Sequence, residues 1–269
     1  MRGLIRQPMM MMVLLILLAF AGAFISLIFI ASDLNRQSDR QQSLLLDKAL
    51  QTRQAVMQFH LSDNAEWGEA YQNLHRTLNR SWAWDNQNLG ASLFDTFAYE
   101  GVFVISPQDE TRYSVIRGQP EERTLSLWLG ADPLPRIKTQ LQASAGKAIS
   151  DYVLAKGQLT LYSAAWITPG GDRSVTALPG PPSLMIFTDR LTPQKLLKLG
   201  HEYGIQNLHL DTSPAGQPAS PALLLSVGDK RVALVWRSAN PGGALLTGLL
   251  PLLVLIMLLS LFTALMLMR

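Results

Sequence analysis

Two long stretches without a charged residue constrain the fold of this 269-residue chain more than any other feature. No charge occurs between Arg6 and Asp33, and none occurs between Arg237 and Arg269. Because a helix of about 20 apolar residues spans the core of a bilayer, both stretches are long enough to cross a membrane. The sequence therefore predicts two transmembrane helices, residues 8–31 and 244–268.

The basic residues at the two ends predict the orientation of these spans. Arg2 and Arg6 precede the first span, Arg269 follows the second, and short cationic flanks stay in the cytoplasm. These three arginines account for the net charge of +3, so the domain between the spans is formally neutral. We expect a membrane protein with residues 1–7 and the C-terminal end in the cytoplasm, a domain on the outer side, and no nucleic acid partner.

A cleaved signal peptide is the alternative interpretation of the first span. Ala19-Phe20-Ala21 would serve as its cleavage site. The apolar run is longer than that of a typical signal peptide and continues well past this site, which favours an uncleaved anchor. The absence of cysteine is compatible with an oxidising compartment.

A stem helix, residues 32–62, is expected to follow the first span. It begins with a stretch that is polar on every side, and apolar residues then recur roughly on one side at Leu45, Ala49, Val56 and Phe59. The helix is expected to reach Leu78, with a kink near Ser62–Asp63, where either side chain could cap a new helix. Contact within a homodimer and packing on its own domain are both open as the role of this side.

The remaining domain, residues 63–240, reads as hairpins alternating with short helices. Helices are expected to start at Asp132-Pro133 and Thr192-Pro193. Short turns join most strands, which predicts an α+β fold with a largely antiparallel sheet and helices on one side. The loop 168–183, rich in proline and glycine, is expected to be disordered. The expected strands are 99–106, 112–117, 151–155, 158–167, 184–188, 205–210, 222–227 and 231–236.

Motifs of catalysis and metal binding are missing from the sequence. It contains no glycine-rich phosphate loop, no H-E-x-x-H and no G-x-S-x-G. The four histidines, His60, His75, His201 and His209, lack the close spacing of a zinc site. We therefore expect no catalytic residue, no metal and no cofactor in this chain.

Several motifs spread over the domain resemble one known family. They are N-A-E-W-G-E-A-Y from Asn64, W-x-W-D-N-x-N-L-G from Trp82, the strand Val102–Ile105, the strand from Leu184 that runs into T-D-R-L-T-P-Q-K-L, and the final V-W-R-S-A-N-P-G-G. From Asp63 to about Trp236 the sequence resembles the type-four member of the CHASE families, which are extracytoplasmic sensory domains. The resemblance implies a Cache/PAS-like sensor domain held between two membrane helices, here a periplasmic domain anchored in a bacterial inner membrane.

The resemblance also implies an output. Such domains usually control a cytoplasmic diguanylate cyclase or phosphodiesterase, but this chain stops at Arg269 without a G-G-D-E-F or E-A-L motif. We expect a sensor fragment of a longer protein, and the other possibility is action through a separate partner. The rival function is a membrane-tethered binding or assembly protein without signalling output.

The resemblance places a small ligand between the concave face of the sheet and the bend after the first helix. Tyrosine and tryptophan suit such a site because they combine apolar area with a hydrogen-bonding end. The alternative is that these aromatic residues are core, and the stimulus is either a small molecule or an envelope protein. The candidates are Trp67, Tyr71, Trp82, Trp84, Asp85, Tyr113, Tyr162 and Trp166.

Overall fold

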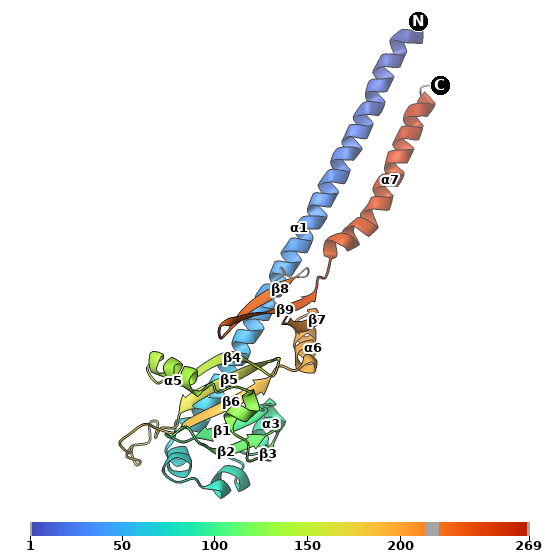
Figure 1. Cartoon of the computed structure of the whole chain (residues 1–269). Coiled ribbons are helices and arrows are strands. Elements are labelled where there is room, and N and C mark those ends of the chain that lie inside the picture. Colours follow the sequence, from blue (N-terminus) through green and yellow to red (C-terminus); the bar gives the residue numbers. More distant parts are fainter. Residues whose placement is uncertain (1, 213–220, 268–269) are drawn as a thin grey trace.

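Two long helices leave the folded domain at the same end and run side by side (Figure 1). The computed structural model describes residues 2–212 and 221–267. Helices α1 (Arg2–Ala65) and α7 (Pro241–Leu267) contain the two uncharged stretches, and each is long and apolar enough to cross a membrane. The second helix starts earlier than the predicted residue 244.

Helix α1 is continuous through the first span, the stem and the start of the domain (Figure 1). The kink predicted near Ser62–Asp63 is wrong, because the helix continues through these residues and ends at Ala65. Glu66 and Trp67 form isolated β-bridges instead. The amide of Thr168 donates to the carbonyl of Ala65 (3.1 Å), so a distant loop satisfies the end of the helix. Helix α2 (Gly68–Ala70) and the π-helical turns η1 (Tyr71–Arg76) and η2 (Ser81–Asp85) follow, so the helix predicted to Leu78 is divided.

The strands form two antiparallel sheets rather than the single sheet that the sequence suggested. The larger has the order β3-β2-β1-β6-β5-β4, packs against the C-terminal part of α1 and lies farther from the two predicted spans (Figure 1). The smaller has the order β7-β9-β8 and lies between the larger sheet and the spans (Figure 1). The strands are β1 (Gly101–Ile105), β2 (Thr111–Ile116), β3 (Gln119–Pro120), β4 (Ile149–Ala155), β5 (Gln158–Trp166), β6 (Leu184–Arg190), β7 (Gln206–Asp211), β8 (Ala222–Val227) and β9 (Lys230–Arg237).

Helices cover both faces of the larger sheet, so the prediction of helices on one side is wrong. The reason lies in strands such as β1, in which every residue is buried. Val102 and Val104 belong to the core under α1, whereas Phe103 and Ile105 belong to a second core under α4 (Leu125–Leu129) and α5 (Leu134–Ala143). A continuous apolar run of this kind is typical of a strand covered on both sides. The predicted α+β class with a mainly antiparallel sheet is confirmed.

The stem packs on its own domain through a face different from the predicted one. Leu46, Met57 and Leu61 are fully buried in the core beneath the larger sheet. Of the predicted side, Ala49 is buried, but Phe59 is 69% exposed, and Leu45 and Val56 are also exposed. The stem therefore has an inner face that holds the domain and an outer apolar face, and its role in a homodimer stays a prediction.

Two short helices complete the fold. Helix α3 (Ser92–Phe97) precedes β1, and α6 (Pro193–Glu202) connects the two sheets and packs against β7. The Thr192 hydroxyl accepts from the amide of Lys195 (3.3 Å), which is the predicted cap of α6.

Candidate functional site

The aromatic candidates near the first break in the helix lie together at the end of the domain remote from the spans. The rings of Trp67 and Trp82 have their centroids 5.7 Å apart. The Trp82 indole donates to Glu69 (3.2 Å), and the Trp67 indole donates to the carbonyl of Asn64 (3.1 Å). Trp82 is almost fully buried, whereas Trp67 is 37% exposed. The pair thus lies at the surface of the helix-rich end of the domain, with Trp82 on the inner side and Trp67 on the outer side.

Three further candidates belong to the same end of the domain as the two tryptophans. Tyr113 is buried in the same core, and its hydroxyl donates to the carbonyl of Leu89 (3.0 Å). Burial raises the pKa of Tyr113, so the phenol remains protonated. Trp84 is half-buried against this core, and Asp85 is exposed.

Tyr162 and Trp166 lie elsewhere. Both belong to the core under α4 and α5, on the opposite face of the larger sheet from Tyr113. The Tyr162 hydroxyl donates to the side-chain oxygen of Gln140 on α5 (2.7 Å). The eight candidates therefore do not line one pocket, because successive side chains of a strand point to opposite faces of the sheet and enter two separate cores. Their roles in ligand binding stay predictions.

The loop 168–183 is held by the turn that carries Tyr71, so the prediction of disorder is wrong. The amide of Leu178 donates to the hydroxyl of Tyr71 (2.7 Å), and the amide of Ser183 donates to Nδ1 of His75 (3.1 Å). The Arg76 guanidinium donates to the carbonyl of Thr176. Proline and glycine content indicated a loop, but not that backbone groups of this loop would find partners on η1.

A buried ionic cluster joins the stem to the larger sheet. Asp189, near the end of β6, is completely buried and accepts from Nε of Arg53 on α1 (2.8 Å) and from Nζ of Lys195 on α6 (2.5 Å). Lys195 also donates to Glu100 (3.1 Å), directly before β1. Burying a carboxylate is costly unless it is paired, so these contacts hold α1, α6 and the sheet in one arrangement. The sequence signal was a carboxylate followed by an arginine at the end of a mainly apolar strand.

The polar start of the stem binds the segment that leads into α7. Asn35, Asp39 and Gln42 follow one another at helical spacing and present one face of α1. Sequence reasoning missed this face, because the stretch looked polar on every side. The three contacts are Asn35 to Asn240 (2.9 Å), Ser238 to Asp39 (2.7 Å) and the Trp236 indole to Gln42 (2.9 Å).

The two long helices come closest directly beyond these contacts. The amide of Gly242 donates to Oδ1 of Asn35 (2.7 Å). A Cβ atom on Gly242 would lie only 1.9 Å from the carbonyl oxygen of Ala31. Small residues permit such close approach of membrane helices. We call this set, Ala31, Asn35, Asp39, Gln42 and residues 236–242, the junction.

The charged and polar groups of the ionic cluster and of the junction hold elements of the fold together. Within residues 2–212 and 221–267, no three histidine, aspartate or glutamate side chains lie close enough to hold a metal ion. The charged and polar groups described above instead bind one another across elements.

Comparison with known proteins assigns the chain. The profile described as CHASE4 domain matches residues 49–211. This chain belongs to the CHASE4 family. The match includes the ionic cluster of Asp189, whereas the junction residues lie outside it. The CHASE4 sensor domain is thus flanked by two helices that are candidates for membrane spans.

Solved structures similar to this CHASE4 protein are sensory domains of the Campylobacter jejuni chemoreceptor Tlp3 (CcmL). One has 11% identity and a TM-score of 0.42, and covers 80% of this chain and 99% of the chemoreceptor chain. Its complexes with isoleucine (11% identity) and L-valine (12% identity) each have a TM-score of 0.41 and cover 80% of this chain and 98% of theirs. No curated protein matches the sequence.

The ionic cluster leads to a prediction about the stability of the CHASE4 domain. Asp189→Asn should lower the free energy of unfolding by about 2–3 kcal/mol, at the low end for a buried ion pair because Arg53 and Lys195 retain access to water. Chemical unfolding of the detergent-solubilised chain, followed by tryptophan fluorescence, measures the change. Asp95→Asn at an exposed position should stay within about 0.5 kcal/mol of the wild type. Equal effects of the two variants would contradict the role of the cluster.

His75 leads to a prediction about pH. Burial, and then the charges of Arg112 and Arg76, lower its pKa from the ordinary value of 6.5. The unfolded chain then takes up this proton at higher pH than the folded chain, so the stability that neutral His75 contributes is present above about pH 6.5 and is lost as the pH falls below it. Between about pH 7.5 and pH 5.5, the melting temperature of the wild type should fall more than that of His75→Gln.

The control for this experiment is His201→Gln, because His201 is exposed. It should reproduce the pH dependence of the wild type. If His75→Gln reproduced it as well, His75 would not hold the loop through its neutral ring.

Proposed function

We propose that this chain is a transmembrane sensor module that converts an event at its outer domain into movement of α1 relative to α7. The observation that carries the proposal is the continuity of α1. Its residues are buried in the core at Leu61 and exposed as a span at Phe29, within one uninterrupted helix (Figure 1). A displacement at the sensor end therefore has a direct mechanical route to the membrane.

The energetic requirement is that two arrangements of the domain differ in affinity for the stimulus. The ionic cluster and the junction are two of the places where directional bonds fix α1 to the rest of the chain. A stimulus that favours another position of the sheet or of α6 would act on α1 through Asp189. The junction would then determine how far α7 follows. The stimulus is a small molecule or an envelope protein.

We further propose a periplasmic domain of Cache/PAS type in the bacterial inner membrane, with both termini in the cytoplasm. Arg2, Arg6 and Arg269 support this orientation. A homodimer would bring two copies of α1 and α7 together. The output would be synthesis or hydrolysis of cyclic di-GMP, by a domain beyond Arg269 or by a separate partner.

The orientation gives a direct prediction. Alkaline phosphatase, which is active outside the cytoplasm, should be active when fused at Gly170. Green fluorescent protein, which fluoresces inside, should fluoresce when fused after Arg269, because both cationic flanks are retained in the cytoplasm. An external C-terminal end would overturn the proposal, since an output in the cytoplasm requires the second span to return there.

Transmission through the junction gives a second prediction. With a diguanylate cyclase domain fused after Arg269, Gly242→Ala should change cyclic di-GMP output about fivefold or more, because the new methyl group displaces α7 from Ala31. Gly248→Ala is the matched control on the same helix, where a Cβ atom meets nothing within 4 Å. Identical output from both variants and the parent would favour a tethered binding protein whose helices are only anchors.

A further inference from the structure

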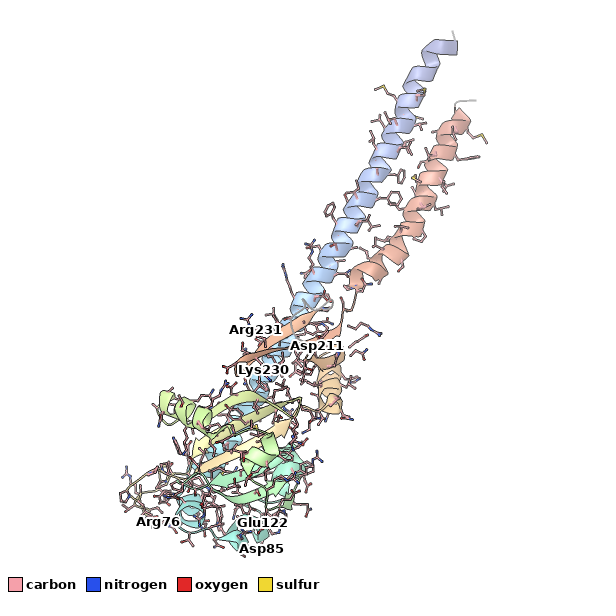
Figure 2. All side chains as sticks on the ribbon, viewed as in Figure 1. Arg76, Asp85, Glu122, Asp211, Lys230 and Arg231 are labelled. Carbon is pink, nitrogen blue, oxygen red and sulfur yellow. The ribbon has the colours of Figure 1, made fainter. Side chains whose placement is uncertain are left out.

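A cleft of about 360 Å³ lies at the edge of the larger sheet, between the segment after η1 and the chain around β3. It belongs to the end of the domain farthest from the predicted spans, where Figure 2 labels Glu122. Its volume lies in the range of small-molecule sites. Tyr113 is shared with the predicted ligand residues. The other lining residues are Arg80, Thr111, Arg112, Ser114, Pro120, Glu121, Glu122, Arg123 and Thr124.

An irregularity in β2 separates Arg112 from the ladder of the sheet. Val104 of β1 lies opposite Tyr113, but the next residue, Ile105, lies opposite Thr111. Arg112 is the extra residue of this β-bulge. Bulges redirect side chains and are frequent beside functional sites. Here the bulge contributes a half-buried guanidinium to the wall of the cleft.

The guanidinium groups of Arg80 and Arg112 are unpaired in the part of the chain that the structure describes: neither makes a hydrogen bond or an ion pair there. Other arginines of the domain are engaged, as Arg136 is with Asp151 (2.6 Å) and Arg123 with Glu121 (3.1 Å). Arg80 is exposed and Arg112 is half-buried, and neither guanidinium is among the buried unsatisfied groups of the described residues, so both remain open to solvent at the cleft. Arg80 and Arg112 are therefore available to an incoming anion.

The charges of the cleft indicate which anion fits. Three arginines face two glutamates, so the lining carries a single positive charge in excess. Guanidinium groups bind carboxylates through two parallel hydrogen bonds. The Tyr113 hydroxyl already donates to the carbonyl of Leu89, so Arg80 and Arg112 are the groups left to bind the anion, and the carboxylate of Glu122 would repel a ligand of higher negative charge.

We propose that this cleft binds a small organic carboxylate, with the carboxylate group held by Arg80 and Arg112. The inference rests on the proposed sensor function, for which such a molecule would be the stimulus. A monoanion matches the single excess charge, whereas a dianion such as phosphate would leave one negative charge uncompensated.

Trifluoroacetate, observed by fluorine NMR at constant ionic strength, tests the site on the detergent-solubilised full chain. The wild type should show saturable binding. Arg112→Gln and Arg80→Gln should each weaken the binding about tenfold or more, the effect of losing a charge-assisted hydrogen bond. Arg173→Gln is the matched control, because it removes the same charge at an exposed position outside the cleft, and it should bind like the wild type.

Three outcomes would overturn the inference. They are the absence of saturable binding, an equal loss in Arg173→Gln, and displacement of trifluoroacetate by inorganic phosphate at lower concentration than by acetate. Melting temperatures of the ligand-free variants should match that of the wild type, since the two arginines hold no partner; a large drop would assign them to the fold instead. No signalling is measured, so failure here would leave the roles of α1 and α7 untouched.

Discussion

One helix has to satisfy three surroundings along its length, and the rest of the structure depends on that constraint. In the first span its side chains are exposed on several sides, as the successive residues Ile28, Phe29 and Ile30 are. At the junction a polar face meets the segment before α7, and from Leu46 to Leu61 an apolar face enters the core. A helix pairs its own backbone groups, so it can pass through all three surroundings without leaving donors or acceptors unsatisfied.

The ionic cluster adds a fixed point to this helix. Apolar side chains such as Leu50 and Met57 pack without strong directional preference, and repacking can preserve much of their contribution. The pairing of Arg53 with the buried Asp189 is directional, because a guanidinium donates in the plane of its fork. We interpret this pair as the contact that determines which turn of α1 faces β6, while the apolar contacts supply most of the area.

The sequence allowed prediction of those elements that are encoded locally. The short turn between the strands expected at 151–155 and 158–167 and the cap at Thr192 depend on neighbouring residues, and both occur as expected. What depends on distant partners was missed. Nothing near Tyr113 or Tyr162 indicates that the two rings belong to opposite cores, because both strands are buried on both faces around these residues.

The same distinction explains the loop and the junction. Residues 168–183 are rich in proline and glycine, and their backbone finds partners at the end of α1 and on the turn η1. Asn35, Asp39 and Gln42 look like a solvated stretch until the segment before α7, some two hundred residues later, is placed beside them. Polar residues at helical spacing can therefore indicate a contact face of a helix, as apolar residues at that spacing do.

Because α1 is one unbroken helix, it also determines the rotation of the span about the helix axis relative to the sheet. Each residue of an α-helix turns by about 100°, so one residue inserted between the junction and Arg53 would rotate the span by that angle relative to the sheet, whereas seven would nearly restore its direction. The face that the span presents to the lipid, to α7 or to a second copy is thus set by the sheet some distance away. Relatives that preserve this coupling should differ in stem length by whole heptads.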